Sequence, residues 1–446
     1  MNTNIYPASL LMALLLLPCM VFAQDNEPLK NEFSISAQLR PRAEYRNGAY
    51  RPLQEGEAPA ILINNRTRFS FDYANTDALK MKVTLQNVNI WGQSNQVQVN
   101  DPTGYGAFSV FEAYGDVKLA DNFRTKIGRQ MIALDDDRLF GTLDWHPAGR
   151  SHDALNFSVK GSKSEVQSWF AYNQNYKATN IGINNPAGQY FTPNDAQPYQ
   201  HMQLLYGKFN VTDKSYFSVL FNNLGFRNDA IAAGSKVNNM QTLGGNWFGN
   251  YGQWKSQLSA FYQMGKAANS KEKKAYMLSG SVGYQVTQPL SLTLGVDYLS
   301  GDSSRNTSGE TRAFDPLYGT HHKFYGHMDY FYVGNPHSNV GLLDLYFNAG
   351  YKASAKTTLG LNSHLFRSSG KILDAQNKEL SKGLGGEFDF LFTHQIYPMV
   401  GLTGGYSTYL HTASLRTIKN TPNARNWQDW LWLSININPK IFSAKF

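Results

Sequence analysis

The chain has almost no cysteine and no apolar segment long enough to cross a bilayer as a helix. Its single cysteine, Cys19, lies in the N-terminal apolar stretch. The rest of the chain therefore cannot form disulfides, thiolate nucleophiles or Cys-ligated zinc sites. Lys and Arg outnumber Asp and Glu by 41 to 33, yet no compact basic run is present. This balance indicates an anionic partner and argues against nucleic-acid binding.

The first 23 residues have the pattern of a secretory signal. The run from Leu10 to Leu17 is apolar, and Val21 and Ala23 place small residues where a signal peptidase cleaves. We predict that residues 1–23 are a signal peptide for Sec export. Residues 24–446 then form one mature domain, since no segment has the composition of a linker.

The mature chain consists of about 18 strand-length segments with period-two alternation, from Phe33 to Phe446. Within 290–298, apolar residues at even positions alternate with Ser, Thr, Gly and Asp at odd positions. Within 33–46, the odd positions are mostly apolar and the even positions carry Ser, Gln, Arg and Glu. Such alternation is typical of strands with one face in lipid and the other toward a polar lumen.

Short and long connections alternate along these segments, with short ones near 120–122 and 212–215 and long ones near 135–152 and 300–338. This pattern predicts an all-β fold, an up-and-down antiparallel transmembrane β-barrel of about 18 strands. It has short periplasmic turns and long extracellular loops. We expect it in the bacterial outer membrane, in contact with lipid. A soluble sandwich or propeller is the alternative, but no propeller-like repeat is present.

Two strands break the expected alternation. Val88 and Ile90 fall on the opposite parity from the apolar residues of 81–85, and a β-bulge near 86–87 would restore it. Arg129 falls on the outward parity of 123–131. In 111–119, the alternation assigns Phe111 to the outward face.

Guanidinium groups are concentrated on the inward face of the first strands. An arginine side chain can hold a carboxylate with two parallel hydrogen bonds and does not lose its charge. The inward residues are Arg40, Arg42, Arg46, Arg66 and Arg68. Carboxylates at Asp297, Asp344, Glu387 and Asp389 fall on the inward face of later strands, where they would face the arginines across the lumen. We expect an anion-selective channel, with an unselective porin as the alternative.

The segment 135–155 is too rich in Asp, Arg, His and Trp for an ordinary exposed loop. If it folds inward, its charged residues would set the constriction of the channel: Asp135, Arg138, Asp144, Arg150 and Asp153. A calcium site is the alternative, but three adjacent aspartates lack the spacing of an EF-hand loop. Ser151, His152 and Asp153 are adjacent in sequence, whereas a catalytic triad requires a particular geometry.

A second dense segment runs from Phe314 to Tyr332. His321, His322, His327 and Asp329 are of the residue types that bind zinc, but their spacing matches no standard site. We expect instead a loop whose aromatic residues pack at the mouth of the barrel, with Lys323 adding positive charge. We therefore expect neither a metal nor another cofactor.

The same two segments resemble a known family. The resemblance lies in Ile127-Gly128-Arg129-Gln130, Asp136-Asp137-Arg138-Leu139-Phe140-Gly141, Leu143-Asp144-Trp145, Gly149-Arg150 and Asp153-Ala154. It continues in His322-Lys323-Phe324-Tyr325-Gly326, Met328-Asp329-Tyr330-Phe331 and Gly385-Gly386-Glu387-Phe388-Asp389. These runs are similar to segments of the alginate export porins of bacterial outer membranes.

The resemblance implies a monomeric barrel of 18 strands with a constricted, arginine-rich channel for polyuronates. Periplasmic export partners are left open. By the resemblance, the residues of the substrate path are Arg129, Asp136, Arg138, Asp144, Arg150 and Asp153. Arg40, Arg66 and Arg68 join them by strand parity and by the basic lumen of the family, and Lys323 by its place in the second segment.

These observations predict a passive outer-membrane porin and no enzyme. Its cargo would be an anionic oligo- or polysaccharide such as an alginate-like polyuronate, or a related carboxylate. A general or phosphate-type porin is the first alternative. An outer-membrane hydrolase is the second, but no inward Ser, His and Asp set can be placed at one membrane depth.

Overall fold

The computed structural model describes residues 31–92, 108–173, 199–226, 237–333 and 337–446. The predicted signal peptide lies outside the described residues, as do 93–107, 174–198 and 227–236 of the long connections.

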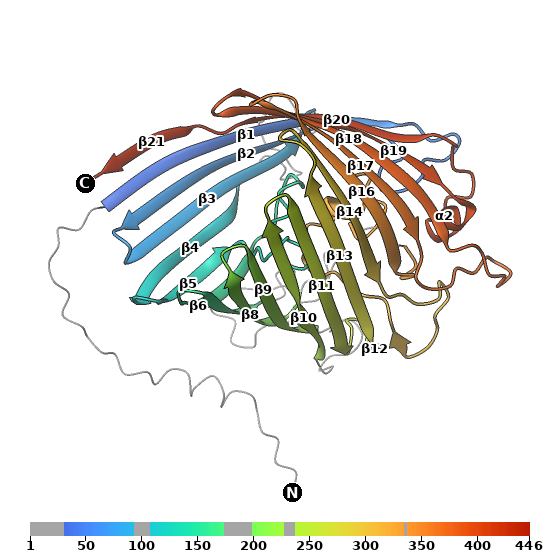
Figure 1. Ribbon diagram of the computed structural model, residues 1–446, viewed down its shortest axis with the longest axis horizontal. Helices are drawn as coiled ribbons and strands as arrows, with labels where there is room; N and C mark the ends of the chain where they lie inside the picture. The colour runs from blue at the N-terminus through green and yellow to red at the C-terminus, as the bar shows by residue number, and fades with distance from the viewer. Residues whose placement is uncertain (1–30, 93–107, 174–198, 227–236, 334–336) are drawn as a thin grey trace, which may run out of the picture.

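Within the described residues, eighteen antiparallel strands form one closed sheet, if the two halves of the last strand are counted as one, and this confirms the predicted barrel (Figure 1). Each strand pairs with its neighbours in the chain, and the last strand returns to β1 (Asn31–Asn47). Both halves of the last strand, β20 (Gln428–Ile437) and β21 (Lys440–Lys445), are paired with β1. Pro439 lies between the two halves and donates no backbone hydrogen bond. The first half of the barrel consists of β1 (Asn31–Asn47), β2 (Ala60–Asn75), β3 (Leu79–Ile90), β4 (Ser109–Ala120), β5 (Phe123–Gln130), β6 (His152–Lys160), β7 (Ser164–Tyr172), β8 (His201–Thr212) and β9 (Ser215–Phe226).

The connections of the second half carry small elements of their own. Its strands are β10 (Asn238–Tyr251), β11 (Trp254–Gly265), β13 (Ala275–Gln285), β14 (Leu290–Leu299), β16 (Leu342–Lys352), β17 (Thr357–Arg367), β18 (Gly383–Tyr397), β19 (Val400–His411), β20 (Gln428–Ile437) and β21 (Lys440–Lys445). The small elements are β12 (Glu272–Lys273), β15 (Glu310–Thr311), the 3-10 turn η1 (His321–Lys323) and the helix α2 (Ala413–Ile418). In the described part of the chain, no helix is long and apolar enough to span a bilayer.

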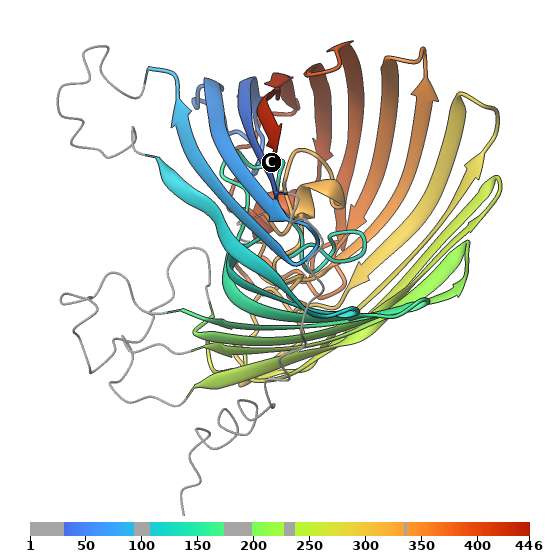
Figure 2. The same cartoon turned by 90° about the vertical axis from the view of Figure 1, so that its left-hand side faces the viewer.

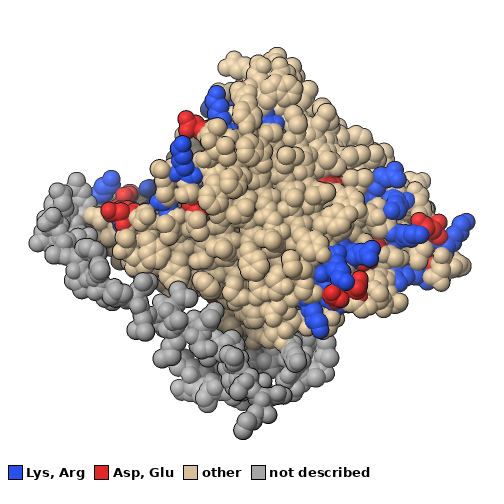
Figure 3. Space-filling view, turned by 60° about the horizontal axis from the view of Figure 1, so that its bottom comes forward, with Lys and Arg blue, Asp and Glu red and all other residues tan. Residues whose placement is uncertain are grey.

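The strands expose apolar side chains outward and bury polar ones inward. Leu258 and Leu294 are 59% and 65% exposed, whereas the inward Gln263 and Asp297 are fully buried. Figure 3 shows a broad outer face with very few charged side chains, and most Lys, Arg, Asp and Glu residues in view lie toward its margins. Such a surface is suited to the hydrocarbon core of a membrane.

The prediction of a β-bulge near residues 86–87 is wrong, because β3 pairs with β2 without interruption from Ile90 to Leu79. The irregularity lies instead between β3 and β4, where Thr84 pairs with Glu112 and Leu85 pairs with Val110. Phe111 is the extra residue of this β-bulge. The bulge turns its side chain into the barrel, so the outward assignment of Phe111 is wrong as well.

The apolar core lies inside the ring of strands, near the end with the long connections. Figure 2 shows coil segments of these connections within the ring. Apolar residues of two of them, among them Phe140 and Phe331, pack against inward side chains such as Met277 and Trp430. We name these connections the first loop (residues 131–151, between β5 and β6) and the second loop (residues 300–341, between β14 and β16).

Candidate functional site

The first loop brings one carboxylate to three arginines of the lumen wall. The Asp144 carboxylate lies 2.8 Å from a guanidinium nitrogen of Arg66 on β2 and 3.2 Å from one of Arg40 on β1. A nitrogen of Arg68, also on β2, is 3.5 Å away. The Asp144 side chain is 57% exposed, whereas those of Arg40, Arg66 and Arg68 are 15%, 1% and 12% exposed. We name Arg40, Arg66 and Arg68 the arginine cluster.

Side chains of the barrel wall orient the arginine cluster. Gln38 accepts a hydrogen bond from Nε of Arg66 at 3.0 Å, and Gln86 accepts one from Nε of Arg68 at 2.7 Å. The Arg68 guanidinium lies over the Phe111 ring, 3.6 Å from its centroid. Sequence reasoning missed these three supporting residues. The inward parity of Gln38 was a usable signal, but the inward turn of Phe111 depends on the bulge.

The arginine cluster also sets the charge of the carboxyl group that it holds. Burial by itself would raise the pKa of Asp144, but the positive charges of Arg66, Arg40 and Arg68 outweigh it and lower this pKa below its usual value. Asp144 is therefore ionised at neutral pH.

The part of the barrel wall formed by β1 and β2, together with the carboxylate of Asp144, carries more positive than negative charge. Next to the arginine cluster, Arg42 and Arg46 both donate hydrogen bonds to Glu44, at 2.8 Å each. Five guanidinium groups thus share the two carboxylates of Glu44 and Asp144. The electrostatic potential next to these five arginines is therefore positive.

The beginning of the first loop is attached to the opposite wall. Asp135 accepts hydrogen bonds from Tyr206 on β8, Ser218 on β9 and Asn246 on β10, at 2.7–2.8 Å. Burial raises the pKa of Asp135, although these three donors favour its charged form. The first loop therefore spans the lumen from β10 to β1.

Arg138 gives the first loop a third attachment. Its guanidinium lies 2.8 Å from Asp297 on β14 and 3.2 Å from Asp136, and the Arg138 and Asp297 side chains are almost fully buried. The guanidinium also lies over the Phe324 ring of the second loop. The predicted residues Asp136 and Arg138 are therefore brought together, in a buried site rather than on an open channel wall.

The second loop packs on the first through polar contacts. Lys323 donates a hydrogen bond to the Asp136 carbonyl at 2.9 Å and lies 3.4 Å from the Asp137 carboxylate. Arg150 donates hydrogen bonds to the carbonyls of Tyr318 and Gly319. Burial lowers the pKa of Arg150 to about 10. The predicted residues Arg150 and Lys323 thus join the two loops.

Aromatic rings extend the contact between the two loops toward the arginine cluster. Trp145 lies parallel to the His322 ring, with 3.9 Å between ring centroids, and its other contacts include the Arg42 guanidinium at 4.0 Å. His322 lies 2.8 Å from Asp329 through its Nδ1 atom. Burial lowers the pKa of His322 to about 3 and raises that of Asp329 to about 8. The imidazole is therefore uncharged at neutral pH.

The inward carboxylates of the later strands do not face the arginines across an open lumen, so that expectation is wrong. They are fully buried and are held by nearby groups. Asp297 binds Arg138, and Asp344 is 2.9 Å from His364. Glu387 accepts a hydrogen bond from the backbone nitrogen of Met328 in the second loop, at 2.7 Å. These carboxylates help to hold the loops in place.

Arg129 and Asp153 are brought together, but away from the other predicted residues. They are paired across β5 and β6, with nitrogen–oxygen distances of 2.7 and 2.8 Å, and are 42% and 51% exposed. They share the outward parity of Ile127, which is 60% exposed. The predicted place of this pair in the substrate path is therefore corrected: the side chains lie on the outer face.

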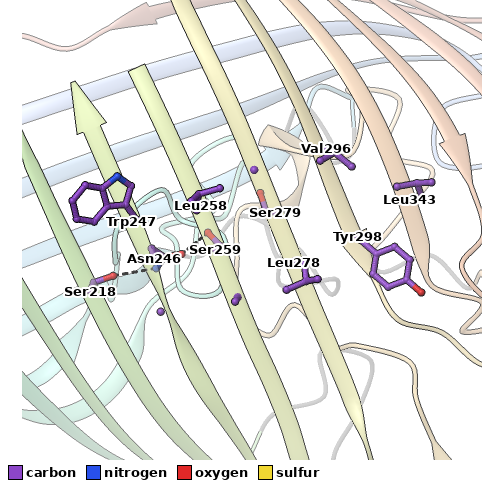
Figure 4. Close-up of a pocket in the computed structure, with 13 residues that line it drawn as sticks. Ser218, Asn246, Trp247, Leu258, Ser259, Leu278, Ser279, Val296, Tyr298 and Leu343 are labelled. Atoms are coloured by element: carbon purple, nitrogen blue, oxygen red, sulfur yellow. Dashed lines mark hydrogen bonds between the residues drawn. The ribbon is translucent and has the colours of Figure 1, made fainter. Parts of the chain in front are cut away.

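A hollow of about 770 Å³ lies across β9 to β16 (Figure 4). Unlike the arginine cluster, it is lined mainly by apolar side chains. Outward apolar side chains such as Leu258 and Leu278 line it, and no charged residue does. Asn246 donates a hydrogen bond to Ser218 and accepts one from Ser259 at the polar side of the hollow. In the described ranges, no group of three His, Cys, Asp or Glu side chains is arranged to hold a metal.

Comparison with known proteins gives one family and one fold. A sequence model of the family described as alginate export matches residues 31–371. No curated protein has a significantly similar sequence. Among solved structures, OccK8 (OprE) of Pseudomonas aeruginosa superposes with a TM-score of 0.59 at 11% identity, over 92% of this chain and 98% of its own.

Two further crystal structures have the same architecture. OccAB4 of Acinetobacter baumannii gives a TM-score of 0.60 at 9% identity, over 92% of this chain and 98% of its own. OpdK of Pseudomonas aeruginosa, in a structure with vanillate, gives 0.56 at 12% identity, over 92% and 99%. At such low identity the likeness concerns the fold alone.

Proposed function

The chain belongs to the alginate export family of outer-membrane channels, and from this premise we propose that it is a passive channel selective for anions that carry carboxylates. Uronate oligomers and polymers are the substrate class that we favour. The observation that carries the proposal is the convergence of Arg40, Arg66 and Arg68 on one carboxylate inside the barrel. Transport is diffusion down a gradient, with no chemical step.

The chemistry of uronates suits this wall. A uronate polymer carries one carboxylate per sugar, and guanidinium groups bind carboxylates with charge-assisted, directional hydrogen bonds. The pairs of Arg42 and Arg46 with Glu44 extend the basic surface along β1. We propose that a single barrel forms the pathway, because the ring of strands is closed.

A small carboxylate is the second candidate cargo. The two loops lie across the lumen and are fixed to several strands, which favours short substrates over polymers while the loops stay in place. The crystal structure of OpdK contains vanillate, an aromatic carboxylate. Uronate monomers, oligomers of increasing length and vanillate should therefore be compared directly.

Single-channel recording in a planar bilayer tests the proposal. Reversal potentials in a KCl gradient give the anion preference, and current block is measured with an oligogalacturonate and with a neutral oligosaccharide of equal length. We expect anion preference and block by the oligogalacturonate alone. Replacing Arg40, Arg66 and Arg68 together by Gln should abolish both effects.

Arg129→Gln is the matched control, because this arginine also binds an aspartate but on the outer face. It should leave the reversal potential unchanged. If the triple variant keeps the anion preference of the unmodified channel, the arginine cluster is not the selective element. Weak selectivity without any block would identify a general porin.

A further inference from the structure

The contact between Asp144 and the arginine cluster resembles a bound ligand in its binding site. The three arginine side chains are mostly buried in the wall, while the Asp144 side chain is more than half exposed. Here the face of the carboxylate away from the arginines remains open to the lumen.

The arginine cluster has supports that do not involve the Asp144 carboxylate. Gln38 and Gln86 bind the Nε atoms of Arg66 and Arg68, and Phe111 lies under the Arg68 guanidinium. Backbone carbonyls of the first loop also accept hydrogen bonds from terminal guanidinium nitrogens, that of Asp144 from Arg40 at 2.8 Å and that of Ala148 from Arg68 at 3.4 Å. One terminal nitrogen of each arginine is directed at the position of the Asp144 carboxylate. A carboxylate from another molecule at that position would find the same donors.

The first loop is also attached independently of Asp144. Asp135 holds its beginning to β8, β9 and β10, and Arg138 binds Asp297 on β14. After the carboxylate of Asp144 swings away, these contacts would keep the loop in the barrel. Rotation of the Asp144 side chain would free the guanidinium nitrogens that bind its carboxylate, while the backbone contacts of Arg40 with Asp144 and of Arg68 with Ala148 remain.

We propose that Arg40, Arg66 and Arg68 form a carboxylate-binding subsite that Asp144 occupies as a tethered competitor, and that a carboxylate of the permeating anion displaces it. This inference rests on the proposed function and specifies how its site works. The exchange replaces one carboxylate by another, so no proton moves and no covalent bond changes. The sugar or aromatic ring beyond the carboxylate stays in the lumen, on the open side of the subsite.

A competing carboxylate weakens the strong binding of anions that is expected of three clustered cations. An unoccupied cluster would hold a polyanion tightly, whereas conduction requires binding that is weak enough to release. A tethered carboxylate is present at a high effective concentration and lowers the apparent affinity for every carboxylate in solution. Asp144 would thereby keep passage fast while the arginines keep it selective.

Block by a uronate monomer tests the inference. The half-blocking concentration of galacturonate is measured on single channels of the unmodified protein and of Asp144→Asn and Asp144→Ala. We expect both variants to lower it about tenfold, because the site loses its charged competitor. Asp144→Asn is nearly isosteric, so it separates loss of charge from loss of volume.

Asp153→Ala is the matched control, since this aspartate also pairs with an arginine and is exposed to a similar extent, but lies on the outer face. It should leave the half-blocking concentration unchanged. Equal block in Asp144→Asn and the unmodified channel would overturn the inference, as would an effect of Asp144→Ala alone, which would make Asp144 a steric obstacle. Failure of the proposed function is distinguishable, because the triple arginine variant would then keep its reversal potential.

Discussion

The indole ring of Trp145 lies parallel to the imidazole ring of His322, with 3.9 Å between their centroids and 7° between their planes. Trp145 belongs to the first loop and His322 to the second, so this stack joins two connections that come from opposite parts of the barrel. The same indole lies under the Arg42 guanidinium of β1. The two loops and the basic wall therefore form one packed unit.

Trp145→Ala should loosen this unit. The stack alone contributes about 0.5–1.5 kcal/mol beyond the apolar area that it buries. We expect larger current fluctuations in single-channel recordings and faster proteolysis within the second loop. Trp254→Ala is the control, because Trp254 is exposed at the start of β11 and contacts Tyr284 on the outer surface. If both variants behave alike, the stack does not couple the loops.

Arg138→Met should destabilise the barrel by about 3–5 kcal/mol, because it leaves the carboxylate of Asp297 buried without its partner. The measurement is the midpoint temperature of unfolding in detergent, followed by gel mobility. Arg51→Met provides the comparison, since Arg51 pairs with Glu57 and the two side chains are 47% and 33% exposed. That variant should lose less than about 1 kcal/mol. Equal shifts in the two variants would contradict a special role for the buried pair.

Asp135→Ala should release the beginning of the first loop. Tyr206, Ser218 and Asn246 lose a shared acceptor, at a cost of about 1–3 kcal/mol. Hydrogen exchange should then be faster across residues 131–151 and unchanged in the strands. Asp121→Ala, in a turn where the side chain is fully exposed, should leave exchange in the loop as it is. Unchanged exchange in Asp135→Ala would show that other contacts hold the loop.

Lys419 should make the packing next to α2 sensitive to pH. Its side chain is buried near Tyr330 and Phe331, and burial lowers its pKa from 10.5 to about 7. Between about pH 7 and 10.5, the Lys419 amine therefore carries a proton when the segment is open and lacks this proton when the segment is packed. Stability of the packed state must rise with pH in this window and fall as the pH returns toward 7.

Protection from hydrogen exchange around 413–421, corrected for intrinsic rates, should accordingly be higher at pH 9 than at pH 7. Lys419→Met should remove the difference, because the buried amine is gone. Lys378→Met, at an exposed position of a neighbouring connection, should retain it. A pH-independent protection in the unmodified protein would mean that Lys419 keeps its charge when it is packed.

Local sequence patterns predicted the fold because the relevant physics is local. Each strand must place apolar side chains toward lipid and polar ones toward the lumen, so a period of two appears within a single strand. The same parity placed Arg40, Arg66 and Arg68 inward, where Arg66 is buried in the lumen wall and the side chains of Arg40 and Arg68 are 15% and 12% exposed. It also put Arg129 outward, where the structure has it paired with Asp153.

The contacts within the site were not predictable in the same way. Asp144 is 104 residues from Arg40 and 78 from Arg66 in the sequence, and no pattern within the loop specifies these partners. Phe111 shows the same limit on a smaller scale, because its inward direction results from a bulge that only the pairing with β3 reveals.

The sequence by itself therefore determined the barrel, its apolar outer surface and the basic inner face of the first strands, since alternation along one strand fixes all three. Only the tertiary structure decided which of these charges meet. The first loop brings Asp144 to the arginine cluster while Asp135 and Arg138 are held by strands on the other side of the lumen. Such contacts depend on the closure of the whole ring.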